Sequence, residues 1–300
     1  MSSEVKKVFF IVNKYSGSGY REDVEGLILS CCKENNIEGT IAYTHRPGHA
    51  TTLAAEALSA GFQKVVAVGG DGTVNEVAQG LLHTHVAMGI IPKGSGNGLA
   101  RHLGIPLKIN LALKCLFTSQ KITMDTFRIN GKLSLNVSGI GFDGHIADLF
   151  GADTKRGLQG YTKHILNEFM NFPEFDARIT YGEIQIKKMA FVIAIANSSQ
   201  YGNNARIAPA ASICDQLLDI SILKKIPPYR LDFVYSFFSG TIDQSAYCET
   251  LQVRDAEIQL NGPMAFHVDG EPAGKAEHFF IEIVPASLNI LAPLERSCKL

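Results

Sequence analysis

The chain has little charge for its 300 residues and no excess of either sign. Charged residues make up 19% of the sequence, and 28 Lys and Arg against 29 Asp and Glu leave a net charge of -1. A disordered chain needs low hydrophobicity and high net charge, whereas 46% of these residues are hydrophobic. Without a basic surplus, no general attraction to nucleic-acid phosphates is expected. The composition therefore predicts a folded protein that does not bind nucleic acid.

Long apolar runs are also missing. Apolar stretches such as VFFIV at 8–12 and FVIAIA at 191–196 are much shorter than the roughly 18 residues of a membrane-spanning helix and have the length of buried strands. The first residues, MSSEVKKVFFIVNK, lack the apolar core and the cleavage site of a signal peptide. We therefore expect a cytoplasmic protein.

The six cysteines form no pattern typical of a metal site or a disulfide framework. The sequence has no C-x-x-C pair and no Cys/His spacing that suits zinc. We expect reduced thiols that mostly pack as small hydrophobic side chains. Two of them are adjacent and the others are scattered: Cys31, Cys32, Cys115, Cys214, Cys248 and Cys298.

The length predicts two domains, and the first part of the chain alternates strand and helix patterns. This alternation predicts a parallel sheet covered on both faces, with its ligand site beyond the carboxyl ends of the strands. The Gly-rich turns after residues 13, 68 and 92 would lie at that edge. The predicted strands are 8–13, 40–44, 64–68 and 86–91, and the predicted helices lie near 21–35, 49–61 and 73–83.

From about residue 122 the pattern changes to many short strands joined by turns. Helical patterns occur there only near 157–171 and 228–240. Such a pattern predicts an antiparallel sandwich or barrel-like domain. With a boundary near 118–124, we expect one domain at 1–121 and a second at 122–285. The final strands, near 286–300, are expected to pack back on the first domain.

The strongest motif follows the predicted strand at 64–68. There GGDGT at 69–73 connects the strand to a helix. Glycines let the backbone turn sharply and approach a ligand closely, and the amide groups at a helix start favour phosphate oxygens. Asp71 would stand beside that phosphate, where it could bind Mg²⁺ or accept a proton from an attacking hydroxyl. Walker A and G-x-G-x-x-G loops have other spacings, so these two designs are excluded.

A second Gly-rich loop, PKGSGNG at 92–98, follows the predicted strand at 86–91 and precedes a helix. Its glycines flank Ser95 and Asn97, which favours a loop that holds a phosphate or a nucleoside. Asn97 could equally serve only as the N-cap of the next helix. Near the other end of the sequence, FHVDGE at 266–271 holds two acids separated by one glycine. A plain β-turn has the same composition, so this motif alone predicts no site.

Together and in this order, the motifs resemble the diacylglycerol kinase catalytic family, which includes sphingosine kinases and bacterial lipid kinases. GGDGT alone is also similar to loops of NAD kinases and 6-phosphofructokinases. The resemblance implies an α/β N-terminal domain with a parallel sheet, similar to those two enzymes, and a mostly antiparallel β-sandwich C-terminal domain. It covers nearly the whole chain and includes Asn13 with its Gly/Ser turn, THRPGHA at 44–50, GGDGT, PKGSGNGLARHLGIP at 92–106, NVSGIGFDG at 136–144 and VDGE at 268–271.

The resemblance assigns roles to particular residues. It implies two catalytic acids, Asp71 and Glu271, the latter as proton acceptor. Arg156 falls near basic residues that meet the nucleotide phosphates in sphingosine kinases. Asp71 and ten further residues match positions that hold ATP: Asn13, Lys14, Thr44, Gly69, Gly70, Gly72, Thr73, Ser95, Asn97 and Asp269.

The sequence departs from the family pattern at two places. SICDQL at 212–217 resembles a loop that binds a structural Mg²⁺ through the Asp side chain and flanking carbonyls, here Ser212, Asp215 and Leu217. Gln216 stands there in place of the usual glycine. Lys14 follows Asn13, where the family usually has proline. Neither departure involves the two catalytic acids.

The implied activity is transfer of the γ-phosphoryl group of ATP, with Mg²⁺, to the primary hydroxyl of a lipid, most simply diacylglycerol or a sphingosine-like base. The first domain would bind the nucleotide and the second the lipid, with the active site in the cleft between domains. A NAD kinase and a catalytically silent lipid- or nucleotide-binding protein are the alternatives.

The residues that would bind the lipid are not identified by the sequence. Aromatic residues between 142 and 175 are either ordinary core residues or the lining of an acyl-chain pocket. A diacyl lipid stays in its bilayer and no segment here is long enough to cross one, so we expect peripheral contact at the membrane surface. The sequence does not decide whether the chain forms a homodimer.

Overall fold

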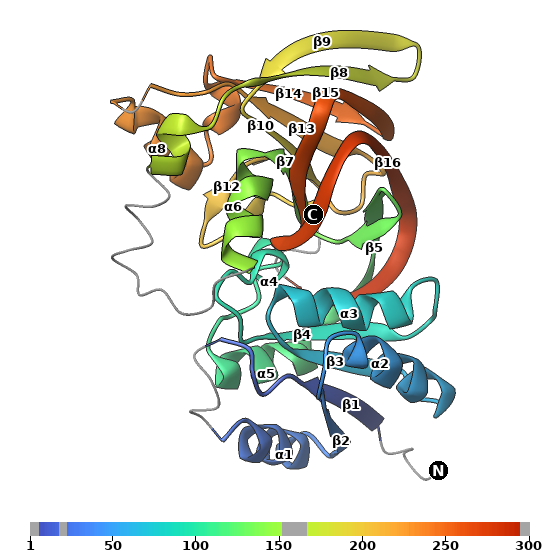
Figure 1. Cartoon of the computed structure of the whole chain (residues 1–300). Coiled ribbons are helices and arrows are strands. Elements are labelled where there is room, and N and C mark those ends of the chain that lie inside the picture. Colours follow the sequence, from blue (N-terminus) through green and yellow to red (C-terminus); the bar gives the residue numbers. More distant parts are fainter. Residues whose placement is uncertain (1–5, 18–22, 152–166, 228, 295–300) are drawn as a thin grey trace. The chain divides into compact units, whose positions relative to one another are not determined.

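The computed structural model describes residues 6–17, 23–151, 167–227 and 229–294. The chain forms two compact units, which are coloured along the sequence in Figure 1. Unit 1 comprises Met1–Thr126 and Pro285–Leu300, and unit 2 comprises Phe127–Val284. Among the described residues, no helix is long and apolar enough to cross a membrane.

Unit 1 is built on a parallel sheet in the order β16-β4-β3-β1-β2. The inner strands of this sheet contain continuous apolar runs. Such runs favour a sheet that is covered on both faces, because no side chain of its strands has to face water. Val65–Val68 and Phe10–Val12 are fully buried, for example. The strands are β1 (Lys6–Val12), β2 (Ile37–Tyr43), β3 (Lys64–Gly69), β4 (Ala87–Pro92) and the last part of β16 (Glu271–Ala292).

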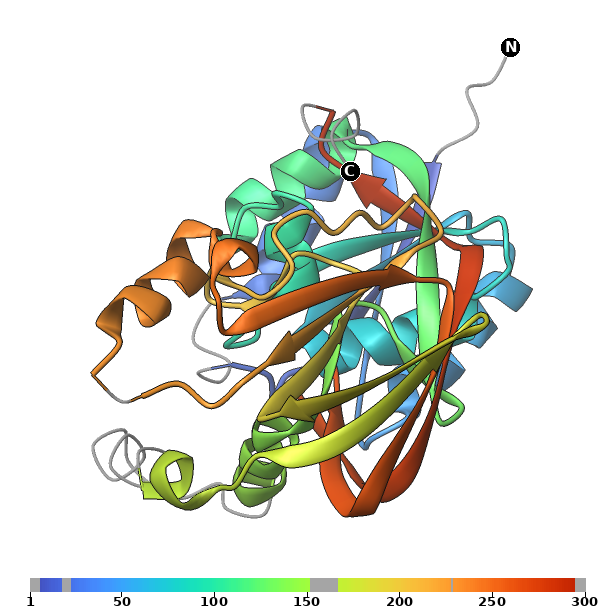
Figure 2. The same cartoon turned by 90° about the horizontal axis from the view of Figure 1, so that it is seen from above.

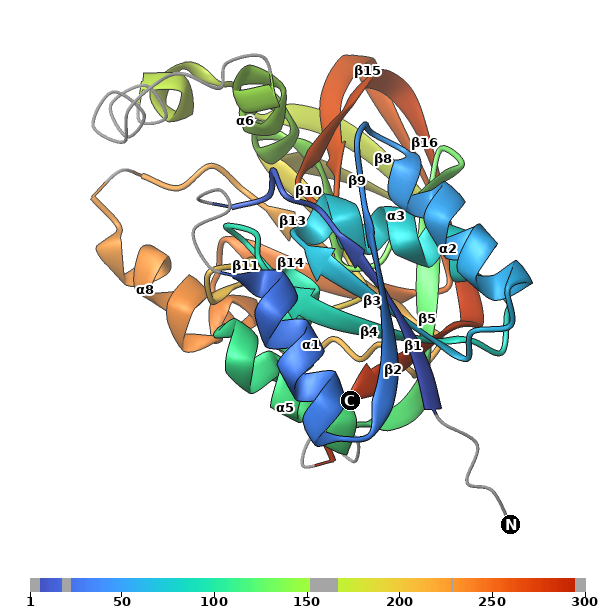
Figure 3. The ribbon, with the colours of Figure 1, turned by 90° about the horizontal axis from the view of Figure 1, so that it is seen from below.

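Helices cover both faces of this sheet, as the sequence pattern predicted. Figure 3 shows α1 and α5 on one face and α2 and α3 on the other. Each helix buries an apolar stripe, such as Val74, Val77, Ala78 and Leu81 of α3. The helices are α1 (Val24–Glu34), α2 (His49–Ser59), α3 (Asp71–Leu81), α4 (Gly98–His102) and α5 (Ile109–Thr118).

Unit 2 is mostly antiparallel, with the strand order β14-β13-β10-β7-β15-β16 (Figure 2). β8 extends it by pairing with β15 and β9. Its core is apolar and includes Phe127, Ile193, Ile220, Ile258 and Phe279. The strands are β5 (Gln120–Ile129, which begins in unit 1), β6 (Lys132–Ser134), β7 (Val137–Gly141), β8 (Phe175–Tyr181), β9 (Ile184–Ala190), β10 (Val192–Ala196), β11 (Gln200–Gly202), β12 (Ala205–Arg206), β13 (Leu218–Leu223), β14 (Cys248–Val253) and β15 (Asp255–Val268).

The helices of unit 2 differ in part from the sequence prediction. The pattern at 228–240 corresponds to α8 (Leu231–Ser239), followed by the short 3-10 helix η1 (Ile242–Gln244). Of the helix predicted near 157–171, residues 167–171 are helical and the rest lies outside the described residues. Helix α6 (Phe142–Gly151) was not among the helices predicted from the sequence. It packs on β7 and β15.

Candidate functional site

Three loops lie together at the carboxyl edge of the unit 1 sheet. β3 pairs with β1 on one side and with β4 on the other, so the segments that follow these strands are neighbours. The backbone continues the pairing beyond the strands: Asn13 N–H donates to Val68 O at 3.0 Å, and Lys93 N–H donates to Gly69 O at 2.7 Å. The expectation that the turns after residues 13, 68 and 92 share one edge is therefore confirmed.

Two glycines let the GGDGT and PKGSGN loops touch backbone to backbone. A Cβ on Gly70 would lie 3.1 Å from the Gly94 Cα, and a Cβ on Gly94 would lie 2.5 Å from the Gly70 Cα. A separation of 2.5 Å is too short for two carbon atoms, so Gly94 cannot be replaced without moving a loop. Close packing of the two loops explains why both carry glycine here.

The Asp71 carboxylate forms a clamp between the same two loops: from the first loop it accepts backbone N–H groups at the end of the second. Its Oδ2 accepts the N–H of Asn97 and its Oδ1 accepts the N–H of Gly98, each at 2.8 Å. Helix α3 begins at Asp71, two residues earlier than predicted, and this places the carboxylate against the start of α4. The negative charge therefore holds the amide groups at the start of the next helix.

Asn97 does not use its side chain as a cap for α4. Its backbone is left-handed, with φ 52°, and its side chain reaches back to Gly94. Gly94 N–H donates to Asn97 Oδ1 at 2.8 Å, and Asn97 Nδ2 donates to Gly94 O at 2.7 Å. The side chain thus closes the PKGSGN loop, whose Ser95 is exposed.

Asn13 and Lys14 connect the first loop to its neighbours. Asn13 Nδ2 donates to Thr73 Oγ1 at 3.0 Å, which links the loop after β1 to the first turn of α3. The Lys14 ammonium lies 3.7 Å from the centroid of the Tyr43 ring. Thr44 is buried, and its N–H donates to Val12 O. Within unit 1, the residues that the resemblance assigned to ATP binding therefore lie close together.

Two basic residues in these loops had no role in the sequence analysis. Lys93 Nζ donates to Ser16 O at 2.6 Å, and partial burial lowers the pKa of this amine. Arg101 Nε donates to Gly96 O at 3.0 Å. Both residues stand within the quoted motif, and the only available signal was a positive charge beside a Gly-rich loop.

The helices of this edge differ in how their first amides are occupied. Glu76 of α3 accepts the N–H groups of Gly48 and Ala50 at the start of α2, at 2.8 and 3.1 Å. Asp71 does the same for α4. No side chain caps α3 itself at Gly70 within the described part of the chain. An anion at this edge would therefore meet the start of α3, where it is also favoured by the helix dipole.

Unit 2 contains the other two acids singled out from the sequence. Asp269 is anchored through its carboxylate, which accepts Ser134 Oγ–H at 2.7 Å, Leu135 N–H at 3.0 Å and Asn136 N–H at 2.9 Å. Glu271 is exposed and is the first residue of β16. Arg156 lies outside the described residues.

The 212–217 loop has donors that suit a hard cation. Asp215 is exposed and its Oδ1 accepts the N–H of Leu217 at 3.0 Å. Gln216 has φ 62°, the left-handed backbone that the usual glycine adopts readily, so its side chain leaves the turn intact. A carboxylate with flanking carbonyls is a ligand set that Mg²⁺ or Ca²⁺ accepts. No cluster of three or more His, Cys, Asp or Glu suited to a metal occurs among the described residues.

An α/β unit with phosphate-type loops at its strand ends, followed by an antiparallel β unit, is the architecture of one class of kinases, and the comparisons agree. Residues 7–129 match the model of the diacylglycerol kinase catalytic domain, and residues 137–292 match that of the YegS C-terminal NAD kinase beta sandwich-like domain. The chain belongs to this family of YegS-like lipid kinases.

Similar proteins cover most of the chain. The protein named "Probable lipid kinase YegS-like" of Pseudomonas aeruginosa PAO1 is 30% identical over 267 residues, which is 87% of each chain. Its namesake in Chromohalobacter salexigens is 29% identical over 260 residues, 84% of this chain and 83% of the other. A crystal structure of a diacylglycerol kinase from Bacillus anthracis shares the fold, with a TM-score of 0.75 at 21% identity, over 98% of this chain and 99% of the other.

Proposed function

We propose that this protein transfers the γ-phosphoryl group of ATP to the primary hydroxyl of a lipid, diacylglycerol or a sphingosine-like base. The observation that carries the proposal is the set of three loops that Asp71, Asn13 and Lys93 tie together at one sheet edge. Phosphoryl transfer depends on positioning and on charge stabilisation, and such a braced edge supplies both. Membership in a lipid kinase family supports the choice of acceptor.

In this proposal each of the two domains binds one of the two substrates. Residues 1–121, together with residues near 286–300, bind ATP, and residues 122–285 bind the lipid. The phosphates lie at the start of α3, between the GGDGT and PKGSGN loops, where amide N–H groups and the nearby Lys14 and Lys93 ammonium groups offset their charge. Thr44, Ser95 and Asn97 complete the nucleotide site.

Mg²⁺ is proposed to arrive with the nucleotide. This ion usually binds through one or two carboxylates together with phosphate oxygens and water, so a cage of protein ligands is not required. Asp71 is the carboxylate beside the proposed phosphates. When bound, the ion would neutralise charge on the phosphates. The Asp215 loop, with Ser212 and Leu217 carbonyls, is proposed to hold a second, structural ion.

Glu271 is proposed to accept the proton of the lipid hydroxyl. As the hydroxyl oxygen forms its bond to the γ-phosphorus, the bond to the leaving ADP oxygen breaks and the proton passes to the carboxylate. An exposed glutamate can be reached by a substrate without rearrangement of a core. Asp269 was assigned to ATP by resemblance, and its three hydrogen bonds show what holds it in place.

We propose that contact with the lipid is made at the surface of a bilayer, through α8 and Tyr229, which lies two residues before it. Tyr229, Tyr235 and Phe238 are 79%, 71% and 56% exposed, whereas Phe233 on the same helix is buried. Tyrosine places an apolar ring and a polar tip at a membrane interface. Residues 224–244 hold three basic and two acidic side chains, so a small positive surplus favours anionic lipid headgroups.

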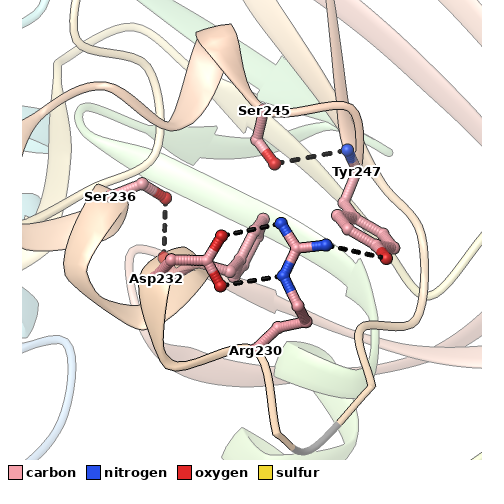
Figure 4. A network of polar contacts seen from close by, with 6 residues as sticks. Arg230, Asp232, Ser236, Ser245 and Tyr247 are labelled. Atoms are coloured by element: carbon pink, nitrogen blue, oxygen red, sulfur yellow. Dashed lines mark hydrogen bonds and ion pairs between the residues drawn. The ribbon is translucent and has the colours of Figure 1, made fainter.

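The start of α8 is fixed by a polar network, shown in Figure 4. Arg230 donates to both carboxylate oxygens of Asp232, at 2.8 and 2.7 Å, and to the Tyr247 hydroxyl at 3.4 Å. The guanidinium lowers the pKa of Asp232. The aromatic side chains would therefore be presented from a helix start with a defined geometry.

A panel of acceptors with radiolabelled ATP tests the activity. We expect phosphorylated product with diacylglycerol or sphingosine in mixed micelles and none with NAD. Product with NAD alone would show a NAD kinase, and binding of ATP or lipid without product across the panel would show a silent binding protein.

Vesicle co-sedimentation tests the membrane surface separately. The double variant Tyr235→Ser/Phe238→Ser should bind anionic vesicles several-fold more weakly, while ATP hydrolysis without lipid is unchanged. Ile184→Ser, which alters a similarly exposed side chain on β9, is the matched control. Equal vesicle binding by the double variant and the control would rule out α8 as the contact.

A further inference from the structure

The hairpin turn between β15 and β16 has a defined conformation. Val268 pairs with Glu271, and the two residues between them have positive φ, 51° at Asp269 and 90° at Gly270. Positive φ at both central positions is the type I′ turn that joins antiparallel strands, and Asp-Gly is one of its preferred sequences. Glu271 is therefore the residue at which the chain leaves a tight turn.

His267 supports this turn from beneath. It is 3% exposed, and its Nδ1 accepts the N–H of Gly270 at 3.1 Å. A ring nitrogen that accepts a hydrogen bond carries no proton, so in the neutral ring the proton is on Nε2. Nε2 lies 3.2 Å from Asp143 Oδ2 and donates to it. One imidazole thus links an amide of the turn to a carboxylate of α6.

Asp143 is held in place from three directions. Its Oδ2 also accepts the Tyr201 hydroxyl at 2.9 Å, and its Oδ1 accepts the N–H of Gly144 at 2.8 Å. Gly139 of β7, which pairs with His267, makes room for this carboxylate, because a Cβ there would lie 1.8 Å from Oδ2. This packing explains why the NVSGIGFDG motif holds glycine at 139 and aspartate at 143, two residues to which the sequence alone gave no role.

We propose that His267, oriented by Asp143, is a positioning residue that fixes the Glu271 turn for catalysis. This inference rests on the proposed role of Glu271 as proton acceptor. Asp269 anchors one side of the turn to residues 134–136, and the Asp143–His267 pair anchors the other side through the Gly270 amide. A misplacement of about 1 Å at a reacting group can cost about 100-fold in rate, which gives such bracing a kinetic value.

A matched pair of substitutions at His267 separates this role from general packing. Asn can place its amide oxygen near the position of Nδ1 and keep the acceptor for Gly270, whereas Gln reaches the position of Nε2 and keeps only the donor to Asp143. We expect His267→Gln to lower kcat by about 10- to 100-fold with the KM for ATP unchanged within about twofold. His267→Asn should restore kcat to within about fivefold of the natural enzyme.

His145→Gln is the matched control, because His145 of α6 also pairs with a carboxylate, that of Glu168 at 2.8 Å. It should keep kcat within about twofold. Turnover is measured as ADP release with diacylglycerol or sphingosine in mixed micelles, beside thermal unfolding of each variant. Equal losses in the Asn and Gln variants, or a rise in the KM for ATP as large as the fall in kcat, would overturn the positioning role.

Glu271→Gln distinguishes the role of Glu271 as proton acceptor from the positioning role of His267. If this variant retains full turnover, the proposed proton acceptor is wrong and the positioning role falls with it. If it loses turnover while both His267 variants remain as active as the natural enzyme, only the positioning role is wrong.

Discussion

Asp71 in unit 1 and Asp269 in unit 2 hold loops in the same way but over very different distances along the chain. Each follows a strand closely, and each carboxylate accepts two backbone N–H groups. The partners of Asp71 lie 26 and 27 residues further on, whereas those of Asp269 lie between 133 and 135 residues earlier. Both carboxylates therefore make the same kind of hydrogen bond, but the two pairs of partners differ in how far apart they lie in the sequence.

The difference comes from the two sheet types. In unit 1, consecutive parallel strands bring their carboxyl ends to one edge, so motifs that follow one another in sequence also meet in space. In unit 2, antiparallel pairing of β15 with β7 joins segments from opposite ends of the unit. The order of the motifs in the sequence therefore predicts the partners of a carboxylate such as Asp71. It does not predict the partners of a carboxylate such as Asp269.

The largest effect is expected at Asp71. Asp71→Asn leaves one acceptor oxygen for two amides, so α4 and the PKGSGN loop lose their anchor and kcat should fall by about 10²- to 10⁴-fold, as for loss of a catalytic acid. Turnover with lipid and ATP would be measured. Glu76→Gln, which weakens the equivalent clamp on α2, should change turnover by less than about threefold. A similar loss in both variants would show a stability effect instead.

The contact between the two Gly-rich loops should be almost as sensitive. Gly70→Val places a β-branched side chain where the Gly94 backbone packs, and we expect ATP to bind about 10- to 100-fold more weakly. Isothermal calorimetry or a fluorescent ATP analogue would measure the affinity. Gly262→Ala, at a position whose added Cβ meets nothing within 4 Å, is the control. Retained affinity in the Gly70 variant would place the phosphates elsewhere.

A smaller effect is expected at the clamp of unit 2. Asp269→Asn preserves the type I′ turn, because Asn-Gly suits it as well as Asp-Gly, but loses charged acceptors for residues 134–136. We expect kcat to fall by about tenfold, with Asp255→Asn at the other end of β15 as control. A loss as large as that of Asp71→Asn would break the comparison and make Asp269 part of the chemistry.

An acid without such a clamp sharpens the comparison. Asp219 is 3% exposed, and its carboxylate accepts a hydrogen bond from the side-chain amide of Gln252 at 3.3 Å. Burial raises the pKa of Asp219 from 3.8 to about 6. Folding therefore favours the protonated form, and this stabilisation is complete below about pH 4 and lost as the pH rises through about 6.

Asp219→Asn mimics the protonated acid at every pH. It should raise the free energy of unfolding above pH 7 by up to about 3 kcal/mol, the equivalent of about two pKa units, and change it little at pH 4. Urea unfolding at both pH values would measure this, and turnover should not change. A variant that is less stable than the natural protein at pH 8 would contradict the assignment.

The contrast between the two units also explains which parts of the fold and of the site could be predicted from the sequence. The parallel sheet, its helices and the edge that gathers Asn13, Asp71 and Asn97 were predicted, because apolar runs and Gly-rich turns are local signals. The role of Asp143 was not, since its partners Tyr201 and His267 lie 58 and 124 residues away. Helix α6 was missed for a related reason: its glycines accommodate tertiary packing, and they look like turn residues in the sequence alone.

Strand β16 has a consequence for how the protein is made. Its first residues pair with β15 in unit 2, and Ile290 near its end pairs with Met88 of β4 in unit 1. About 200 residues separate the two partners of this last pairing. At the usual 5–20 residues per second, roughly 10–40 s of translation pass between them. During that interval β4 has an exposed sheet edge, a template for pairing with other chains. The sheet of the first unit to leave the ribosome is thus completed only after β16 has been made, and until then its β4 edge can pair with other chains.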